Sequence, residues 1–157
     1  MKKFIVKEYD VPIPEGAAVF DLSQNELKHC LGCWACWWAT PGKCVHKDLD
    51  TFYREYLAAD TVYFYCKISQ GFVTSNLKAL IDRMIVLDLP YISWDKGESY
   101  HDPRYEKYPS AVEIIYSGEF LPGEEEAFIA YWERTLGMMF AKTIIIKSYE
   151  TMQEAAQ

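Results

Sequence analysis

Segments typical of β-strands alternate with segments of helical periodicity along this chain, and that alternation restricts the fold more than any other feature. Alternating polarity and β-branched residues predict strands at residues 4–7, 17–21, 61–66, 111–116 and 143–147. Apolar residues at helical spacing predict helices around 49–57, 73–84 and 128–140. Such alternation favours a mostly parallel sheet with helices on both faces. The strand at 61–66 is almost entirely apolar, so we expect it to be buried on both sides.

The connection between the first two predicted strands is unusually short. It offers only residues 11–16, which read VPIPEG and include two prolines. A crossover that brings the next strand back parallel needs about 10–12 residues or more, and usually contains a helix. We therefore expect an abridged sheet without its first helix, in which the N-terminal segment forms an antiparallel hairpin or an edge strand.

Length and charge exclude several classes of function. A chain of 157 residues is long enough for one domain over residues 1–157 with a core of its own. The net charge of −7, without a cluster of Lys or Arg, argues against nucleic acid and against an anionic membrane surface as partners. No apolar run approaches the 18 residues of a membrane span, and Glu8 and Asp10 interrupt the start that a signal peptide would need. We expect a soluble, cytoplasmic protein.

Four of the five cysteines are crowded into one segment, and in a cytosolic protein such crowding is typical of metal, cluster or redox chemistry. Cys30, Cys33 and Cys36 have the spacing C-x2-C-x2-C, and Cys44 follows after seven residues. Three thiolates at that spacing, with a fourth nearby, can hold an iron–sulfur cluster. Zinc sites more often pair two separated Cys-x2–4-Cys units. The alternative is a set of free thiols that act as small apolar side chains, and this is our expectation.

Several segments, taken in order, resemble flavodoxin-like NAD(P)H-dependent FMN reductases and the related iron–sulfur flavoproteins. They read CLGCWACW at 30–37, TPGKCV at 40–45, KD at 47–48, AAD at 58–60, LKALIDR at 77–83 and GESYH at 97–101. The resemblance implies a three-layer flavodoxin-like sandwich, an FMN cofactor, NAD(P)H as electron donor, and an oligomer with the flavin near a subunit interface. It also implies that the cysteine loop lies beside the flavin crevice, with its thiols as small buried side chains.

The resemblance and the topology of open parallel sheets agree on where a flavin would bind. Such sheets bind ligands at the carboxyl ends of their strands, where two predicted strands end in turns. The candidate flavin-binding residues are Cys66, Lys67, Ile68, Ser69, Gln70, Gly71, Ser117 and Gly118. The family's proline and tyrosine are missing from 66–71, and the 11–16 connection has no room for a phosphate-binding loop and helix. We therefore expect weak or altered flavin binding.

Three functions remain open from the sequence. The first is electron transfer of the FMN reductase type, which assigns no catalytic residue because hydride transfer through a flavin needs no protein base. The second is a non-catalytic partner or binding subunit that has lost FMN. The third is an iron–sulfur electron carrier. In each case the tryptophans at 34–38 and the polar stretch at 91–109 favour subunit contacts, and we expect a homodimer.

Overall fold

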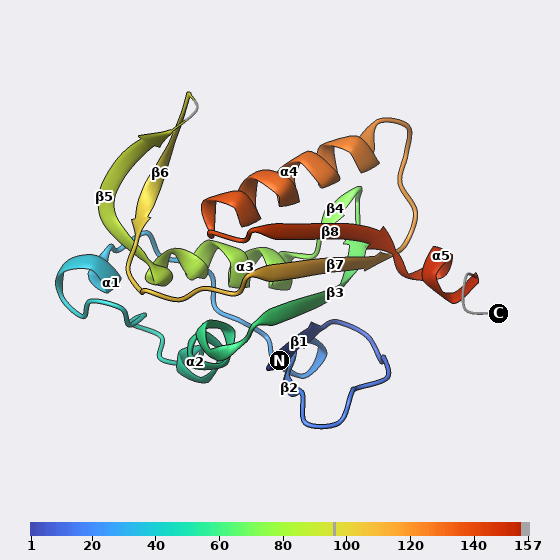
Figure 1. Cartoon of the computed structure of the whole chain (residues 1–157), viewed down its shortest axis with the longest axis horizontal. Coiled ribbons are helices and arrows are strands. Elements are labelled where there is room, and N and C mark those ends of the chain that lie inside the picture. Colours follow the sequence, from blue (N-terminus) through green and yellow to red (C-terminus); the bar gives the residue numbers. More distant parts are fainter. Residues whose placement is uncertain (96, 155–157) are drawn as a thin grey trace.

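The main sheet of the computed structural model, which describes residues 1–95 and 97–154, has five parallel strands in the order β2-β1-β3-β7-β8 (Figure 1). These strands are β1 (Lys3–Lys7), β2 (Ala18–Asp21), β3 (Thr61–Ser69), β7 (Ala111–Ser117) and β8 (Thr143–Ser148). Numbered by their place among the five, they follow the order 2-1-3-4-5 of flavodoxin-like sheets. The predicted α/β fold with a mostly parallel sheet is confirmed.

The remaining elements surround this sheet. A short strand, β4 (Phe72–Val73), pairs antiparallel with the end of β3. A separate hairpin of β5 (Asp88–Asp95) and β6 (Glu98–Pro103) projects from the body where the sequence predicts a long polar connection (Figure 1). The helices are α1 (Ala35–Trp38), α2 (Asp50–Ala58), α3 (Ser75–Arg83), α4 (Glu124–Met138) and α5 (Tyr149–Glu154), with 3-10 turns η1 (Leu22–Gln24) and η2 (Met84–Leu87). None of the described helices is long and apolar enough to cross a membrane.

The first two strands are parallel, and residues 8–17 between them contain no helix. The antiparallel hairpin is therefore wrong, whereas the alternative expectation of an edge strand is confirmed, because β2 lies at the end of the sheet. β2 can run parallel to β1 because the connection between them covers all of residues 8–17, from the end of β1 at Lys7 to the start of β2 at Ala18, and is longer than the 11–16 segment alone. That length is just sufficient for a crossover without a helix.

One face of the sheet carries α2, α3 and α4 and forms the core. Phe52 of α2 packs against Phe4 of β1 with ring centroids 5.5 Å apart, and Trp132 of α4 packs against Phe64 of β3 at 5.6 Å. Registered neighbours in a parallel sheet point to the same side, so the pairing of Val6 with Phe64 places both contacts on one face. Apolar residues of all three helices belong to this buried cluster.

The opposite face is covered much less. Tyr63 and Tyr65 of the central strand point to it and are half-buried, so the expectation that this strand is buried on both sides is wrong. Within the described residues, α5 is the helix on this side, and its Tyr149 packs on Tyr65 at the carboxyl end of the sheet, with ring centroids 6.4 Å apart. The physical reason is the connection between β1 and β2, which has no helix to lay across this face.

Candidate functional site

The point where the strand order reverses lies between the carboxyl ends of β1 and β3, which is where flavodoxin-like sheets bind their ligand. Here the side chain of Glu8, directly after β1, occupies that point. Its Oε2 accepts a hydrogen bond from the backbone N–H of Lys67 at 2.8 Å, and its Oε1 accepts one from the hydroxyl of Thr74. Glu8 is 6% exposed, and burial raises the pKa of its carboxyl. The chain thus places its own buried carboxyl group at the usual ligand position.

The predicted flavin loop, Cys66–Gly71, forms the end of β3 and a tight turn into β4. Gln70 and Gly71 both have positive φ, 52° and 71°, as a two-residue hairpin turn requires. A Cβ on Gly71 would lie 2.3 Å from the carboxyl carbon of Glu124 in α4, so this turn packs directly against that helix. The loop is a closed hairpin rather than an open cradle.

The second predicted edge, Ser117–Gly118, meets the same hairpin. A Cβ on Gly118 would lie 3.0 Å from Cβ of Ile68, and the Ser117 hydroxyl donates a hydrogen bond to Glu150 of α5 at 2.6 Å. The structure therefore brings the two predicted segments together, but packs them against each other. None of the cavities described below is lined by these residues. Cys66 is fully buried at the end of β3, and burial raises the pKa of its thiol far above the usual range.

This crevice, as the chain stands, has no site for the phosphate of FMN. A phosphate needs clustered N–H and hydroxyl donors, yet residues 8–17 provide no helix N-terminus, and Glu8 already occupies the N–H of Lys67 and the hydroxyl of Thr74. An ionised carboxylate beside a phosphate would add repulsion. Sequence reasoning missed Glu8, because an acidic residue directly after a strand expected at the edge of the sheet is usually solvated, whereas β1 lies between β2 and β3. Its position after the first strand of an α/β fold was the available signal.

The four clustered cysteines lie elsewhere and line a single cavity of about 80 Å³, which we call the cysteine cavity. Cys30 and Cys33 are exposed, whereas Cys36 and Cys44 are half-buried, so the implied picture of four buried thiols is wrong for the first two. Burial raises the pKa of the Cys36 thiol, and the neighbouring thiols of Cys44, Cys30 and Cys33 raise it further. The geometric evidence for a shared site is that all four cysteines line this one cavity.

A partly buried ion pair supports the cysteine cavity. Arg83, at the end of α3, lines the cavity and has a side chain that is 0% exposed. Its Nη1 donates to Oδ2 of Asp48 at 2.9 Å and to the backbone oxygen of Lys28 at 3.2 Å, and its Nη2 also pairs with Asp48. The guanidinium thus connects α3 to the segments on both sides of the cysteines. It also holds the pKa of the Asp48 carboxyl below its usual range.

The cysteine loop does not lie beside the crevice, as the resemblance implies, but at the opposite ends of the strands (Figure 1). α3 separates the two places, since it starts beside Thr74 and Glu8 and ends at Arg83. A helix of nine residues spans about 13 Å. The structure therefore provides two separate candidate sites at the two ends of α3.

The donor set of the cysteine cavity fits an iron–sulfur cluster better than a single metal ion. Among the described residues, no three Cys, His, Asp or Glu side chains converge on one point closely enough to hold a metal ion. A cubane cluster takes its four thiolates at four separate corners, so it needs a cavity with cysteines around its wall. The charge of Arg83 is already paired with Asp48, so this residue positions the cysteine loop and leaves the thiolate charge to the cluster's iron.

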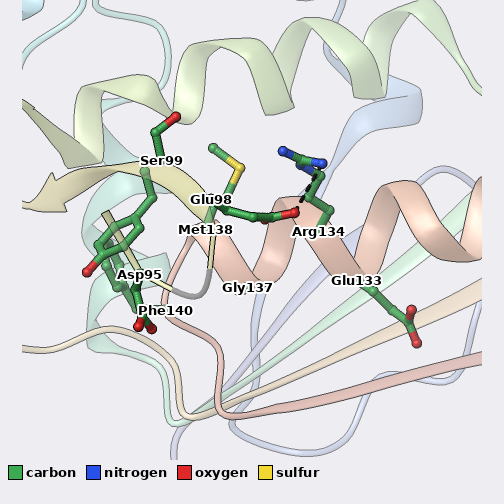
Figure 2. Close-up of a pocket in the computed structure, with 9 residues that line it drawn as sticks. Asp95, Glu98, Ser99, Glu133, Arg134, Gly137, Met138 and Phe140 are labelled. Atoms are coloured by element: carbon green, nitrogen blue, oxygen red, sulfur yellow. Dashed lines mark ion pairs between the residues drawn. The ribbon is translucent and has the colours of Figure 1, made fainter. Parts of the chain in front are cut away.

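A larger hollow, of about 540 Å³, lies between the β5–β6 hairpin and the second half of α4 (Figure 2). Its charged lining residues are Asp95, Glu98, Glu133 and Arg134, and the one cation among them already pairs with Glu98 at 3.3 Å. Figure 2 shows this ion pair crossing from the hairpin to the helix. The pair connects the projecting hairpin to α4 and leaves no free cation among the described lining residues for an anionic ligand.

Comparison with known proteins links the chain to flavoproteins in part of its sequence. No family model matches it. Over 72 residues, 44% of this chain, it is 38% identical to the iron–sulfur flavoprotein MJ0731 of Methanocaldococcus jannaschii. The match covers 36% of that protein, so this similarity spans about a third of the relative's length.

Solved structures confirm the fold. An azoreductase from Bacillus anthracis str. Sterne superposes with a TM-score of 0.63 at 14% identity, and Smu.1420 from Streptococcus mutans UA159 with 0.59 at 16%. An FMN-dependent NADH-azoreductase from Bacillus anthracis str. Ames Ancestor, solved in complex with FMN, gives 0.50 at 11%. Each match covers 94% of this chain and 86% of the other. The resemblance to flavodoxin-like reductases is thus confirmed in the fold.

Proposed function

We propose that this chain is an electron-transferring oxidoreductase and that the cysteine cavity holds its redox centre. The observation that carries the proposal is that Cys30, Cys33, Cys36 and Cys44 line one cavity next to the buried cation of Arg83. The similarity to an iron–sulfur flavoprotein supports it. A cluster bound there would supply one-electron transfer, with the four cysteines as ligands. Arg83 and Asp48 keep the cysteine loop in place.

Iron analysis of protein purified or reconstituted without oxygen tests this proposal. We expect about four iron and four sulfide per chain in the wild type, as for a [4Fe–4S] cluster with four cysteine ligands. Cys33→Ser should lose both, because it removes an exposed ligand without disturbing the core. Cys66→Ala is the matched control: it also removes a cysteine, but one buried in β3 outside the cavity, and it should keep its iron. Wild type without iron, or Cys33→Ser with its full complement, would contradict the proposal in favour of free thiols.

A second candidate is NAD(P)H-dependent reduction of a weakly held FMN at the crevice formed by 66–71 and 117–118. The retained strand order of a flavodoxin-like sheet favours it. Two missing charge-assisted hydrogen bonds to a phosphate, each about 1.5–3 kcal/mol, would weaken binding by roughly two to four decades.

Titration with FMN and with riboflavin separates this candidate from the first. Because the phosphate lacks a site, FMN should bind no more tightly than riboflavin, and Glu8→Gln should improve FMN binding by removing the competing carboxylate. Stoichiometric FMN retained through gel filtration would show that the phosphate is held elsewhere. A protein with neither iron nor flavin would instead support the non-catalytic partner subunit.

We further propose that the chain forms a homodimer in the cytoplasm. The sparsely covered face around Tyr63 and Tyr65 offers apolar surface, as do the exposed Trp34 and Trp38 of the cysteine loop. A two-fold axis would bury the same patch on both copies. A reducing compartment suits the free thiols. Sedimentation at micromolar concentration should give twice the 18.3 kDa of one chain, and a clean monomer would contradict the dimer.

A further inference from the structure

A cavity of about 270 Å³ lies between α3, α4 and the β5–β6 hairpin, and we call it the hairpin cavity. It shares Asp82 and Ile85 with the wall of the cysteine cavity but contains none of the four cysteines. Most of its apolar wall comes from α3, η2 and the end of α4: Ile81, Ile85, Met138 and Met139. Methionine and isoleucine side chains pack well against flat rings.

Asp88, the first residue of β5, presents a buried and unpartnered oxygen at this cavity. The residue is 5% exposed, and within the described part of the chain its Oδ1 has no hydrogen-bond partner. The nearest cation does not provide one, because Arg104 donates to backbone oxygens: its Nε to Val86 at 3.0 Å and its Nη2 to Asp88 itself at 2.8 Å. The carboxyl group is thus enclosed without a protein partner.

His101 of β6 adds a second unpartnered atom to the same wall. Its Nδ1 is buried, and the described residues supply no partner for it. The ring lies against Trp37, with centroids 4.8 Å apart, and the Trp37 Nε1 in turn donates to the backbone oxygen of Asp88 at 3.0 Å. Buried polar atoms are almost always paired in folded proteins. Among the described residues six buried side-chain atoms lack a partner, and the two of Asp88 and His101 belong to residues that line this one cavity, where a ligand could pair with both.

The chemistry of the ligand follows from these walls. Burial raises the pKa of the Asp88 carboxyl to about 7, and the other charged residues of the described lining, Lys78 and Asp82, form an ion pair with each other, so the site does not call for a charged ligand. The volume of the hairpin cavity lies slightly below the usual range for sites that bind drug-sized molecules, so it suits a compound of one or two rings. A ring amide carries an N–H donor and a C=O acceptor side by side. Its N–H complements the Asp88 oxygen, and its C=O complements the His101 Nδ1 when that nitrogen carries the proton.

We propose that the hairpin cavity binds a small, uncharged heteroaromatic compound through a ring amide, whose N–H pairs with Asp88 and whose C=O pairs with His101. The site lies one wall away from the cysteine cavity, and Trp37 connects the two, because its ring also contacts Trp34 at 4.7 Å. The proposal does not depend on what the cysteine cavity holds.

Calorimetric titration of the full chain with lumazine, a two-ring compound with such an amide edge, tests the site. We expect binding to the wild type and a loss of at least about tenfold in Asp88→Leu and in His101→Phe, the size expected for one hydrogen bond to a buried or charged group. Asp95→Asn is the matched control, since it alters an exposed aspartate at the other end of β5 outside the cavity. It should bind lumazine within twofold of the wild type.

The probe itself gives an independent control. Lumazine methylated at both N1 and N3 has no ring amide N–H, so it should bind the wild type about tenfold more weakly but should bind Asp88→Leu no differently from lumazine. Asp88→Leu removes an unpartnered polar group and should melt no lower than the wild type, which separates lost binding from lost folding. No binding of lumazine to the wild type, equal binding of the methylated probe, or unchanged binding in Asp88→Leu would each overturn the proposal.

Discussion

Replacing Asp48 by alanine should destabilise the protein far more than replacing Asp82, although each aspartate pairs with a cation of α3. Arg83 is fully buried and depends on Asp48 for two of its hydrogen bonds. Removing one partner of a buried pair costs about 3–5 kcal/mol. The Asp48 side chain is 34% exposed, so water can replace part of the interaction, and we expect about 3 kcal/mol. The Lys78–Asp82 pair is 40% and 44% exposed, which predicts about 0–1 kcal/mol for Asp82→Ala.

Urea unfolding of both variants measures this difference in the free energy of unfolding directly, provided that the slope of that free energy against urea concentration is the same in both. Arg83 lowers the pKa of Asp48 in the folded state, so its stabilising contribution is complete above the unfolded value near 3.8 and is lost as the pH falls through the lower folded value. The gap between wild type and Asp48→Ala should therefore narrow below about pH 4. If Asp48→Ala and Asp82→Ala differ by less than about 1 kcal/mol at pH 7, Arg83 is not held as the structure implies.

Two further predictions concern the closed crevice. Gly71→Ala should lower the free energy of unfolding more than Gly16→Ala does. Both glycines have positive φ, 71° and 75°, where an alanine costs about 1–2 kcal/mol, but the new Cβ strikes Glu124 at position 71 and has nothing within 4 Å at position 16. Equal melting temperatures would show that the hairpin does not rest on α4. Burial raises the folded pKa of Glu8, so the stability of wild type relative to Glu8→Gln should rise as the pH falls through that raised value towards the unfolded one near 4.5. A relative stability that does not change with pH would mean that Glu8 is solvated, and one that rises with pH would mean that the fold favours its ionised form.

The sheet was readable from the sequence because its signals are local. Four of the five predicted strands end within one residue of the observed β1, β2, β7 and β8, as alternating side chains and β-branched residues indicate. The β5–β6 hairpin was not predicted, because Pro90 and a run of polar residues interrupt the alternation there. Whether β2 would pair parallel or antiparallel with β1 was ambiguous, because after a short connection the direction of the second strand depends on tertiary contacts.

The candidate sites were readable only in part, because their geometry depends on contacts distant in sequence. The spacing of Cys30, Cys33, Cys36 and Cys44 pointed to a shared site, and they do line one cavity. Their position relative to the crevice could not be read from spacing, because it depends on the pairing of Arg83 with Asp48, 35 positions apart. Glu8 becomes important only through Thr74, 66 positions away. The unpartnered atoms of the hairpin cavity likewise require three separate elements to meet.

The missing helix between β1 and β2 accounts for the distribution of the candidate sites over the molecule. Without it, no helix N-terminus supplies phosphate donors at the switch point, and the donors at the start of α3 need another acceptor, which Glu8 provides. A buried carboxyl at that end disfavours an anionic cofactor, whereas Arg83 at the other end of α3, paired with Asp48, anchors the loop that carries four thiols. The missing helix therefore removes the anion site at the usual place of the fold, and the redox site that we propose lies at the amino ends of the strands instead.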